Sequence, residues 1–170
     1  MNHLTETYRL YAHAYNRLAK HCILYQELKN SHLKSTLEST EENARILDFE
    51  AGTGNLTFEL LLKKIRVDAI DISQDMLTIL RKKCDGLKRL HVFSKDILSL
   101  KNSVRKYDSV IAMNVIYHLN DPIRYLTKIN TLMKSEASIS VSGPNKKINV
   151  AHLFETIRFD LEPIHIGNKF

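Results

Sequence analysis

The sequence is poor in the two residues that interrupt regular structure, with 5 glycines and 3 prolines in 170 residues. Residues 1–50 contain neither, and no Pro/Gly-rich linker or internal repeat divides the chain. A chain of this length forms one ordinary domain with a real core, so we expect a single domain over residues 1–170. Hydrophobic residues make up 44% and charged residues 26%, which excludes the disordered and collagen-like classes.

Long apolar runs and cysteine motifs are also missing. No stretch approaches the roughly eighteen apolar residues that cross a bilayer, and the first ten residues carry Glu6 and Arg9 instead of the apolar core of a secretory signal. Cys22 and Cys84 stand far apart without a CxxC partner, which is typical of reduced thiols. No HExxH or comparable metal-binding set is present. We therefore expect a cytoplasmic protein with no membrane partner and no metal site.

The positive charge has two interpretations. The formal net charge is +6, and its densest patch comprises Arg81, Lys82, Lys83, Lys88 and Arg89. Such a patch is compatible with nucleic-acid binding, but it is also typical of the solvated last turn of a helix, where cations complement exposed carbonyls. No aromatic residue interleaves the patch to stack on bases. The helix-end interpretation is therefore favoured, and nucleic acid remains the alternative partner.

The pattern of apolar residues changes near residue 45. Before it, apolar residues recur at helical spacing: Tyr11, Ala14, Tyr15, Leu18, Cys22 and Tyr25. This predicts an N-terminal helical segment over residues 1–40, as one long helix or two joined helices ending near Ser39. After it come five short runs typical of strands: Arg45–Phe49, Val67–Ile72, Leu90–Phe93, Ser109–Met113 and Ser138–Val141.

Helix-length segments separate these runs. Helices are expected from Asn55, from an N-cap at Ser73, and from Asp121-Pro122 to about Lys134. Strands that alternate with helices predict parallel β-α-β units in an α/β fold. A last amphipathic helix is expected within residues 145–170, with its apolar face at Val150, Leu153, Phe154, Ile157 and Leu161. Ligands of such sheets bind beyond the carboxyl ends of the strands, so we expect the site just after the runs.

Glycine is concentrated in the turn after the first run, where residues 46–54 read ILDFEAGTG. Gly52 and Gly54 allow a sharp turn and a close approach of the backbone to a ligand, although two glycines are also common in tight turns without a ligand. The stretch resembles the first motif of class I S-adenosylmethionine-dependent methyltransferases, hydrophobic-hydrophobic-Asp-x-Gly-x-Gly-x-Gly. Glu50 replaces the first glycine, where it would either crowd the methionine part of the ligand or pair with its ammonium group.

A carboxylate closes the second run, in residues 67–73, VDAIDIS. At this place Asp71 can accept hydrogen bonds from both ribose hydroxyls of a nucleoside, as also occurs in NAD-binding domains. Its alternative role is the N-cap of the following helix, for which Ser73 is also suited. We favour the ribose role.

Two later stretches extend the resemblance. Residues 94–97, SKDI, resemble the family pattern in which an aspartate accepts from the adenine amino group and an apolar neighbour brackets the ring. Residues 107–132 resemble the family's Tyr-Asp strand, VLHHL-like segment and Asp-Pro helix cap, which NAD-binding domains do not carry. The family's Lys-Pro-Gly-Gly turn appears here as residues 134–137, KSEA.

The resemblance covers about residues 45–144, the expected nucleoside-binding core. It implies a Rossmann-like three-layer α/β sandwich with a mostly parallel sheet of order 3-2-1-4-5, and S-adenosylmethionine as cofactor. The cofactor-binding residues it implies are Asp48, Glu50, Ala51, Gly52, Gly54, Asp71, Ile72, Met76, Asp96, Ile97, Asn114 and Tyr15. Tyr11 and Tyr15 are candidates for a lid, and plain packing of the first helix explains them equally well.

Methyl transfer from a sulfonium requires alignment, exclusion of water and, for some acceptors, a base. His118 is the candidate base because an imidazole titrates near neutrality, with Tyr117 beside it; packing is the alternative role of His118. Residues 114–117, NVIY, differ from the Asn/Asp-Pro-Pro-Tyr segment typical of methylation of a base amino group. We expect a small-molecule acceptor. The alternatives are a non-catalytic methyltransferase-like binding module and an RNA or protein methyltransferase.

The end of the sequence is short for this family, whose full sheet adds a C-terminal antiparallel hairpin. Here residues 161–170 supply at most one short segment, Ile164–Ile166, so most or all of the hairpin is expected to be lacking. The fifth strand would then be an exposed edge. Three outcomes are open: residues 163–170 fold back over the edge, a second chain pairs with it, or the sequence belongs to a longer protein. We expect marginal stability or self-association.

Overall fold

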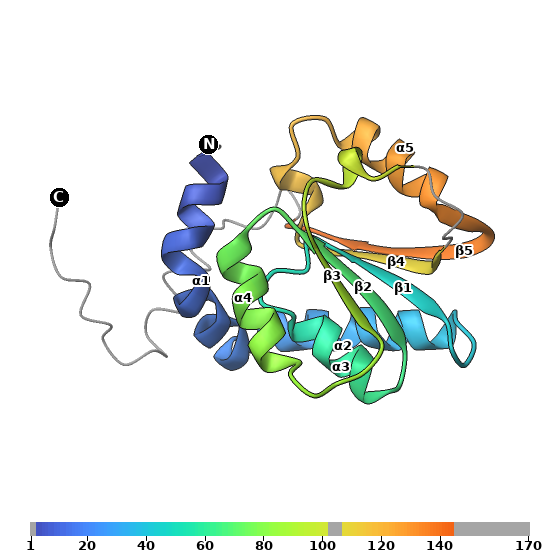
Figure 1. Cartoon of the computed structure of the whole chain (residues 1–170), viewed down its shortest axis with the longest axis horizontal. Coiled ribbons are helices and arrows are strands. Elements are labelled where there is room, and N and C mark those ends of the chain that lie inside the picture. The colour runs from blue at the N-terminus through green and yellow to red at the C-terminus, as the bar shows by residue number, and fades with distance from the viewer. Residues whose placement is uncertain (1–2, 102–106, 145–170) are drawn as a thin grey trace, which may run out of the picture.

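The computed structural model describes residues 3–101 and 107–144, and of residues 3–11 the helical backbone. These residues form a five-stranded parallel sheet with helices on both faces (Figure 1), which confirms the expected α/β fold. The strand order is β3-β2-β1-β4-β5, as the family resemblance implied.

The strands are β1 (Arg45–Phe49), β2 (Arg66–Asp71), β3 (Leu90–Ser94), β4 (Tyr107–Met113) and β5 (Met133–Ser142). The helices are α1 (His3–His21), α2 (Ile23–Glu38), α3 (Asn55–Leu62), α4 (Gln74–Lys83) and α5 (Pro122–Leu132), with 3₁₀ turns η1 (Ile97–Ser99) and η2 (Ile116–His118). None of the described helices is long and apolar enough to cross a membrane.

The N-terminal segment consists of two helices, one of the two arrangements expected. They are separated at Cys22, whose backbone is extended (φ −77°, ψ 110°). This break turns α1 away from α2, so that α1 packs beside α4 while α2 runs along β4 and β5. Helix α1 is thereby brought to the end of the sheet where the loops after the strands gather (Figure 1).

The central strands are buried because apolar helix faces cover both sides of the sheet. On one face α2, α3 and α4 pack over Ile46 and Val67. On the other face α5 and η1 pack over Leu47, Phe49 and Ile70. Burying a side chain of this size stabilises the fold by about 1.5–3 kcal/mol, so the sheet is a rigid support for the loops at its ends.

Strand β5 is longer than the apolar pattern indicated. It begins at Met133 instead of Ser138 and replaces the end of the helix that was expected to reach Lys134. No glycine or proline occurs between residues 133 and 142, so the chain passes directly from α5 into extended backbone (φ −87°, ψ 151° at Met133). Strand β4 likewise begins at Tyr107 instead of Ser109.

β5 forms one edge of the described sheet. It pairs with β4 on one side, and no other strand of residues 3–101 and 107–144 pairs with it. On the face away from α2, Ile139 and Val141 are 42% and 45% exposed. The segments expected to cover or extend this edge, residues 150–161 and 164–166, lie outside the described residues. Self-association through β5 therefore remains a prediction.

A buried histidine joins α2 to β5. His32 is 4% exposed; its Nε2 lies 2.8 Å from the Ser142 hydroxyl and its Nδ1 lies 2.7 Å from the Ser140 hydroxyl. Burial lowers the pKa of His32, so the imidazole is neutral at neutral pH. Ser142 Oγ also accepts from the backbone amide of Asn114 at 3.2 Å, which extends this contact to the carboxyl end of β4.

The variant His32→Asn should lower the free energy of unfolding by about 1–3 kcal/mol at pH 8, because the hydroxyls of Ser140 and Ser142, both half-buried, lose their partner. The pKa of His32 is lower in the folded chain than its ordinary 6.5. Below that pH the unfolded chain therefore binds a proton before the folded chain does. The advantage of the wild type over the variant should shrink as the pH falls from 8 towards 5, measured by urea denaturation at each pH. A constant difference would contradict a buried neutral imidazole.

A half-buried lysine joins three helices. Lys83, in the last turn of α4, donates from Nζ to the side-chain oxygen of Asn16 in α1 at 2.8 Å and to that of Asn55 at the start of α3. Burial lowers the pKa of Lys83 to about 8. This contact holds α1 against the two helices that flank the end of the sheet.

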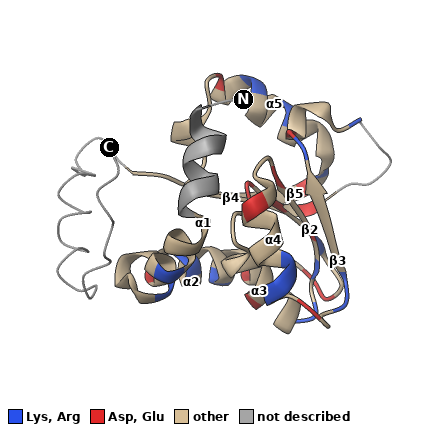
Figure 2. Ribbon diagram, turned by 60° about the vertical axis from the view of Figure 1, so that its left-hand side comes forward, with Lys and Arg blue, Asp and Glu red and all other residues tan. Residues whose placement is uncertain are grey.

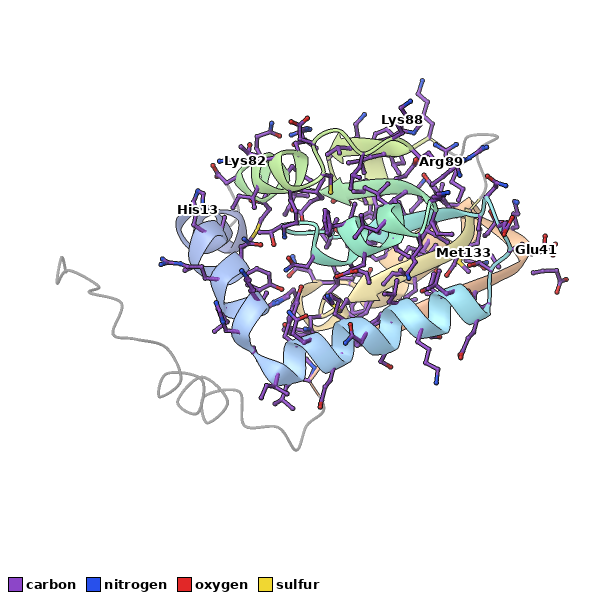
Figure 3. The ribbon with its side chains drawn as sticks, turned by 90° about the horizontal axis from the view of Figure 1, so that it is seen from below. His13, Glu41, Lys82, Lys88, Arg89 and Met133 are labelled. Atoms are coloured by element: carbon purple, nitrogen blue, oxygen red, sulfur yellow. The ribbon has the colours of Figure 1, made fainter. Side chains whose placement is uncertain are left out.

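The basic patch expected from the sequence is divided in space. Lys83 turns inward, whereas Arg81 and Lys82 are exposed in the same last turn of α4. Figure 2 shows this basic stretch as blue ribbon at the end of α4. Lys88 and Arg89 lie apart from Lys82, near the start of β3 (Figure 3). Part of the patch is thus the solvated end of a helix, as favoured from the sequence, and one of its members is a structural residue.

Candidate functional site

The loops after β1, β2, β3 and β4 surround a cavity of about 330 Å³. Its walls are Tyr15, Glu50, Gly52, Asp71, Ile72, Ser73, Met76, Asp96, Met113, Asn114, Val115, His118, Leu119, Asn120 and Tyr125. Parallel strands bring their carboxyl ends to one edge of the sheet. The sheet order therefore gathers residues from distant parts of the sequence at this edge.

The turn after β1 has three residues with left-handed backbone: Glu50 (φ 56°), Gly52 (φ 56°) and Gly54 (φ 73°). A Cβ on Gly52 would meet nothing within 4 Å, so this glycine leaves open space at the cavity wall. A Cβ on Gly54 would lie 2.5 Å from Leu80 Cγ, so Gly54 permits the close packing of α3 on α4. Glu50 holds the conformation that glycine adopts most easily, at the place where the family has glycine.

Some of the residues expected to bind the cofactor do not line the cavity. Asp48 is 4% exposed inside the fold, accepts a hydrogen bond from the Thr57 hydroxyl of α3, and burial raises its pKa to about 6. Ala51 donates from its amide to the Ile70 carbonyl at 3.1 Å and so closes the turn against β2. Ile97 is packed in the core. These residues and Gly54 lie in the layer that supports the lining residues of the cavity. Direct contact between any of them and a cofactor remains a prediction.

Asp71 closes β2, and its carboxylate organises two turns. Oδ2 accepts from the Gly52 amide at 2.8 Å and Oδ1 accepts from the Ser73 amide at 2.7 Å. The side chain is buried, and burial raises its pKa. Ser73 is the N-cap of α4, with Oγ accepting from the Met76 amide at 3.4 Å, so the helix does not need Asp71 for its cap. Each carboxylate oxygen keeps a second lone pair that can accept from a ligand hydroxyl.

Asp96 is held by a tyrosine that the sequence did not single out. Its Oδ1 accepts from the Leu98 amide at 2.8 Å and caps η1, and its Oδ2 accepts from the Tyr125 hydroxyl at 3.0 Å. The Tyr125 ring stacks on Phe49, with centroids 5.9 Å apart. Burial, followed by Asp96, raises the pKa of Tyr125 to about 12, so the phenol keeps the proton that it donates. The available signal was the place of Tyr125 in the first turn of α5, after the Asp121 cap.

The residues after β4 and those of α1 complete the wall. Asn114 has left-handed backbone (φ 59°), and His118 lies in η2. Burial lowers the pKa of His118, so at neutral pH its imidazole is neutral and can accept a proton. Tyr117 does not line the cavity; it is 51% exposed and its ring lies 3.9 Å from that of His118. Tyr15 reaches the cavity from α1 and packs edge-on against Tyr25 at 6.1 Å.

The structure thus brings most of the expected residues together. The expected residues that line this cavity are Tyr15, Glu50, Gly52, Asp71, Ile72, Met76, Asp96, Asn114 and His118. The lining residues that sequence reasoning missed are Ser73, Met113, Val115, Leu119, Asn120 and Tyr125. All of the missed residues except Tyr125 are close neighbours of expected ones in the sequence, so the strand ends were the signal for them.

The cavity is acidic. Glu50, Asp71 and Asp96 line it, and among its described lining residues there is no lysine or arginine. Burial raises the pKa of Glu50 well above its ordinary value, and the charges of Asp71 and Asp96 raise it further. A ligand with positive charge would relieve this crowding of like charges.

The sequence matches the model of the methyltransferase domain family over residues 9–170. The chain therefore belongs to this family, and the resemblance drawn from its motifs is confirmed. Among curated relatives, the ribosomal RNA small subunit methyltransferase A of Mycoplasma mycoides subsp. mycoides SC is 29% identical over 132 residues, which cover 69% of this chain and 49% of that protein. The chain spans about half the length of the curated relatives it matches.

Solved structures share the fold at lower identity. The [4+2]-cyclase SpnF superposes with a TM-score of 0.67 at 20% identity, covering 77% of this chain and 55% of that one. Magnesium protoporphyrin IX methyltransferase of Synechocystis PCC 6803, solved with bound SAM, has a TM-score of 0.58 at 20% identity and covers 65% and 55%. At this identity the likeness concerns the fold, which carries more than one chemistry.

Proposed function

We propose that this chain binds S-adenosylmethionine in the cavity at the carboxyl ends of its strands and transfers the methyl group to a small molecule. One observation carries the proposal. In this chain, which belongs to the methyltransferase domain family, Asp71, Asp96 and Gly52 line one cavity. The space beside Gly52 is open. The arrangement supplies acceptors for a nucleoside and room for close contact with the backbone.

The donor side depends on carboxylates that are fixed in advance. Two backbone amides orient Asp71, whose remaining lone pairs would accept from the ribose hydroxyls. The Tyr125 hydroxyl and the Leu98 amide orient Asp96, which would accept from the adenine amino group. Asn114 would meet the methionine end. Groups held in place before binding lose little freedom on binding.

The acceptor side lies near η2. The bound donor would supply an electrophilic methyl group on a sulfonium. A lone pair of the acceptor forms the new bond, and the sulfur keeps the electron pair of the broken one. His118 would take the proton that the acceptor loses, because its imidazole is neutral near pH 7. Met113, Val115 and Leu119 give this part of the cavity apolar walls, which favour exclusion of water.

Calorimetric titration with S-adenosylmethionine tests the donor site, and transfer of a labelled methyl group to a panel of acceptors tests the reaction. His118→Asn should keep donor affinity within about twofold and lower the transfer rate by about 10²–10⁴-fold, the usual contribution of a general base. Absence of donor binding by the wild type would contradict the proposal. Donor binding without transfer to any acceptor would favour the non-catalytic alternative.

RNA is the second acceptor class with an observation in its favour, namely the similarity to a ribosomal RNA methyltransferase. The exposed cations Arg81, Lys82, Lys88 and Arg89 would then contact phosphates. Binding to phosphates releases counterions, so affinity for RNA should fall steeply as salt rises. Strong salt-dependent binding of an RNA duplex would favour this class over the small molecule.

A further inference from the structure

Glu50 lines the cavity at a position where the motif of the family has glycine. It follows β1 at the place of the first glycine of the motif, with a left-handed backbone (φ 56°) that a non-glycine residue adopts at a cost. Its side chain is half-buried and forms part of the cavity wall. The chain thus places a carboxylate where glycine would be the easier residue.

The groups around Glu50 leave its negative charge without a compensating cation, so this carboxylate should discriminate between ligands of different charge. Asp71, at the end of β2, and Asp96, after β3, face it, and both act on it electrostatically. The other titratable groups of the wall are His118 and the phenols of Tyr15 and Tyr125. Burial lowers the pKa of His118 and raises that of Tyr125, so neither carries a charge at neutral pH, and the described wall contains no lysine or arginine to balance the carboxylates.

We propose that Glu50 makes the cavity selective for the cationic methyl donor over the demethylated product. This inference rests on the proposed function. The donor carries a sulfonium that the product, S-adenosylhomocysteine, lacks, because the sulfur has become a neutral thioether by keeping the electron pair of the broken S–CH₃ bond. The nucleoside and amino-acid parts of the two molecules are the same. A carboxylate in the wall therefore favours the donor, and its attraction weakens when the methyl group has left.

The consequence for the enzyme is release of the product. Asp71 and Asp96 would contact the nucleoside, which donor and product share, so they hold both ligands. Glu50, near the turn that the family uses for the methionine part, acts on the part that changes charge. Product inhibition, common where the product keeps every contact of the donor, would be weakened in this chain.

The binding of the donor should also move a proton. With two carboxylates nearby, burial and like charge raise the pKa of Glu50 well above its ordinary value, which favours binding of a proton there in the ligand-free chain. A cationic ligand favours the ionised form, and donor binding should release that proton. Calorimetry in buffers of different ionisation enthalpy measures this release directly.

The experiment compares the affinities for S-adenosylmethionine and S-adenosylhomocysteine in the wild type and two variants. Glu50→Gln keeps the size of the side chain, and Glu50→Gly restores the family residue and relieves the backbone. Each should reduce the preference for the donor by about tenfold, the effect of losing one charged partner, and abolish the release of the proton. The matched control is Asp75→Asn, an exposed carboxylate in the first turn of α4 outside the cavity wall, which should change neither.

An unchanged ratio of the two affinities in Glu50→Gln would overturn the inference. Equal tightening of both ligands in Glu50→Gly would overturn it too, and would show that the side chain crowds the ligand. Failure of the wild type to bind either molecule would instead contradict the donor site itself. The two failures are therefore distinguishable.

Discussion

Gly54→Ala should lower the free energy of unfolding by about 2–5 kcal/mol. The new Cβ would lie 2.5 Å from Leu80 Cγ in the contact between α3 and α4, and an overpacked core costs about 1–3 kcal/mol. The left-handed backbone at this position (φ 73°) adds about 1–2 kcal/mol for any residue with a Cβ. Urea denaturation followed by circular dichroism measures the sum.

Gly52→Ala is the matched control for this prediction. Its backbone is also left-handed (φ 56°), but its Cβ would point into open space. It should cost only the backbone part, about 1–2 kcal/mol, and it should weaken binding of S-adenosylmethionine because the methyl group occupies the cavity wall. Equal destabilisation by the two variants would show that the Leu80 side chain moves away from the new Cβ at no measurable cost.

Asp71→Ala should weaken binding of S-adenosylmethionine by about 1.5–3 kcal/mol, the usual range for hydrogen bonds to a charged group. The carboxylate also accepts from the amides of Gly52 and Ser73, so its loss leaves two amides unpaired and loosens both turns. The global fold should survive, because the side chain lies at the end of β2. Calorimetry measures the affinity, and circular dichroism reports whether the chain is folded.

Two further variants separate the ligand from the turns. Asp71→Asn keeps an acceptor oxygen and should lose less affinity than Asp71→Ala. Asp85→Ala removes an exposed carboxylate outside the cavity wall and should leave affinity unchanged. A folded Asp71→Ala chain with the affinity of the wild type would exclude contact between Asp71 and the ribose.

Periodicity and turn residues were sufficient to predict most of the fold. β1 was placed at its observed bounds, and Ser73 was identified as an N-cap. The start of β5 at Met133 was missed because residues 133–137 are mostly polar and carry no strand pattern. Met133 pairs with Tyr107 of β4 and Ser138 pairs with Ser109, so residues 134–137 lie in an irregularity of the ladder between these two pairs. Such pairing is a property of the sheet and not of the segment itself.

The residues of the site could be predicted from the sequence where they directly follow a strand, and less well elsewhere. A motif does not separate residues that contact a ligand from residues that build the turn around it, so Asp48 and Gly54 were grouped with Gly52. The structure separates them by burial and packing. His32 and Tyr125 depend on contacts with distant segments. No local pattern marks His32, and the place of Tyr125 after the Asp121 cap does not show that it reaches Asp96.

The contact between His32 and β5 raises the question of what prevents the strand from sliding along its neighbour. Three serines alternate on the face that meets α2: Ser138, Ser140 and Ser142. Because side chains repeat every second residue on one face of a strand, a displacement by two residues in either direction would still place at least one of these serines beside the histidine. The serine repeat alone does not define the alignment.

The residues that flank the repeat do define it. Displacement in one direction would put Glu136 in the place of Ser138, beside the fully buried hydroxyl of Ser109, where a carboxylate loses its hydration. Displacement in the other direction would put Pro144 in the place of Ser142 and leave a ring nitrogen of His32 without its hydroxyl partner. Glu136 at one end and Pro144 at the other thus fix the register of β5 on β4, which the repeated serines between them would leave undefined.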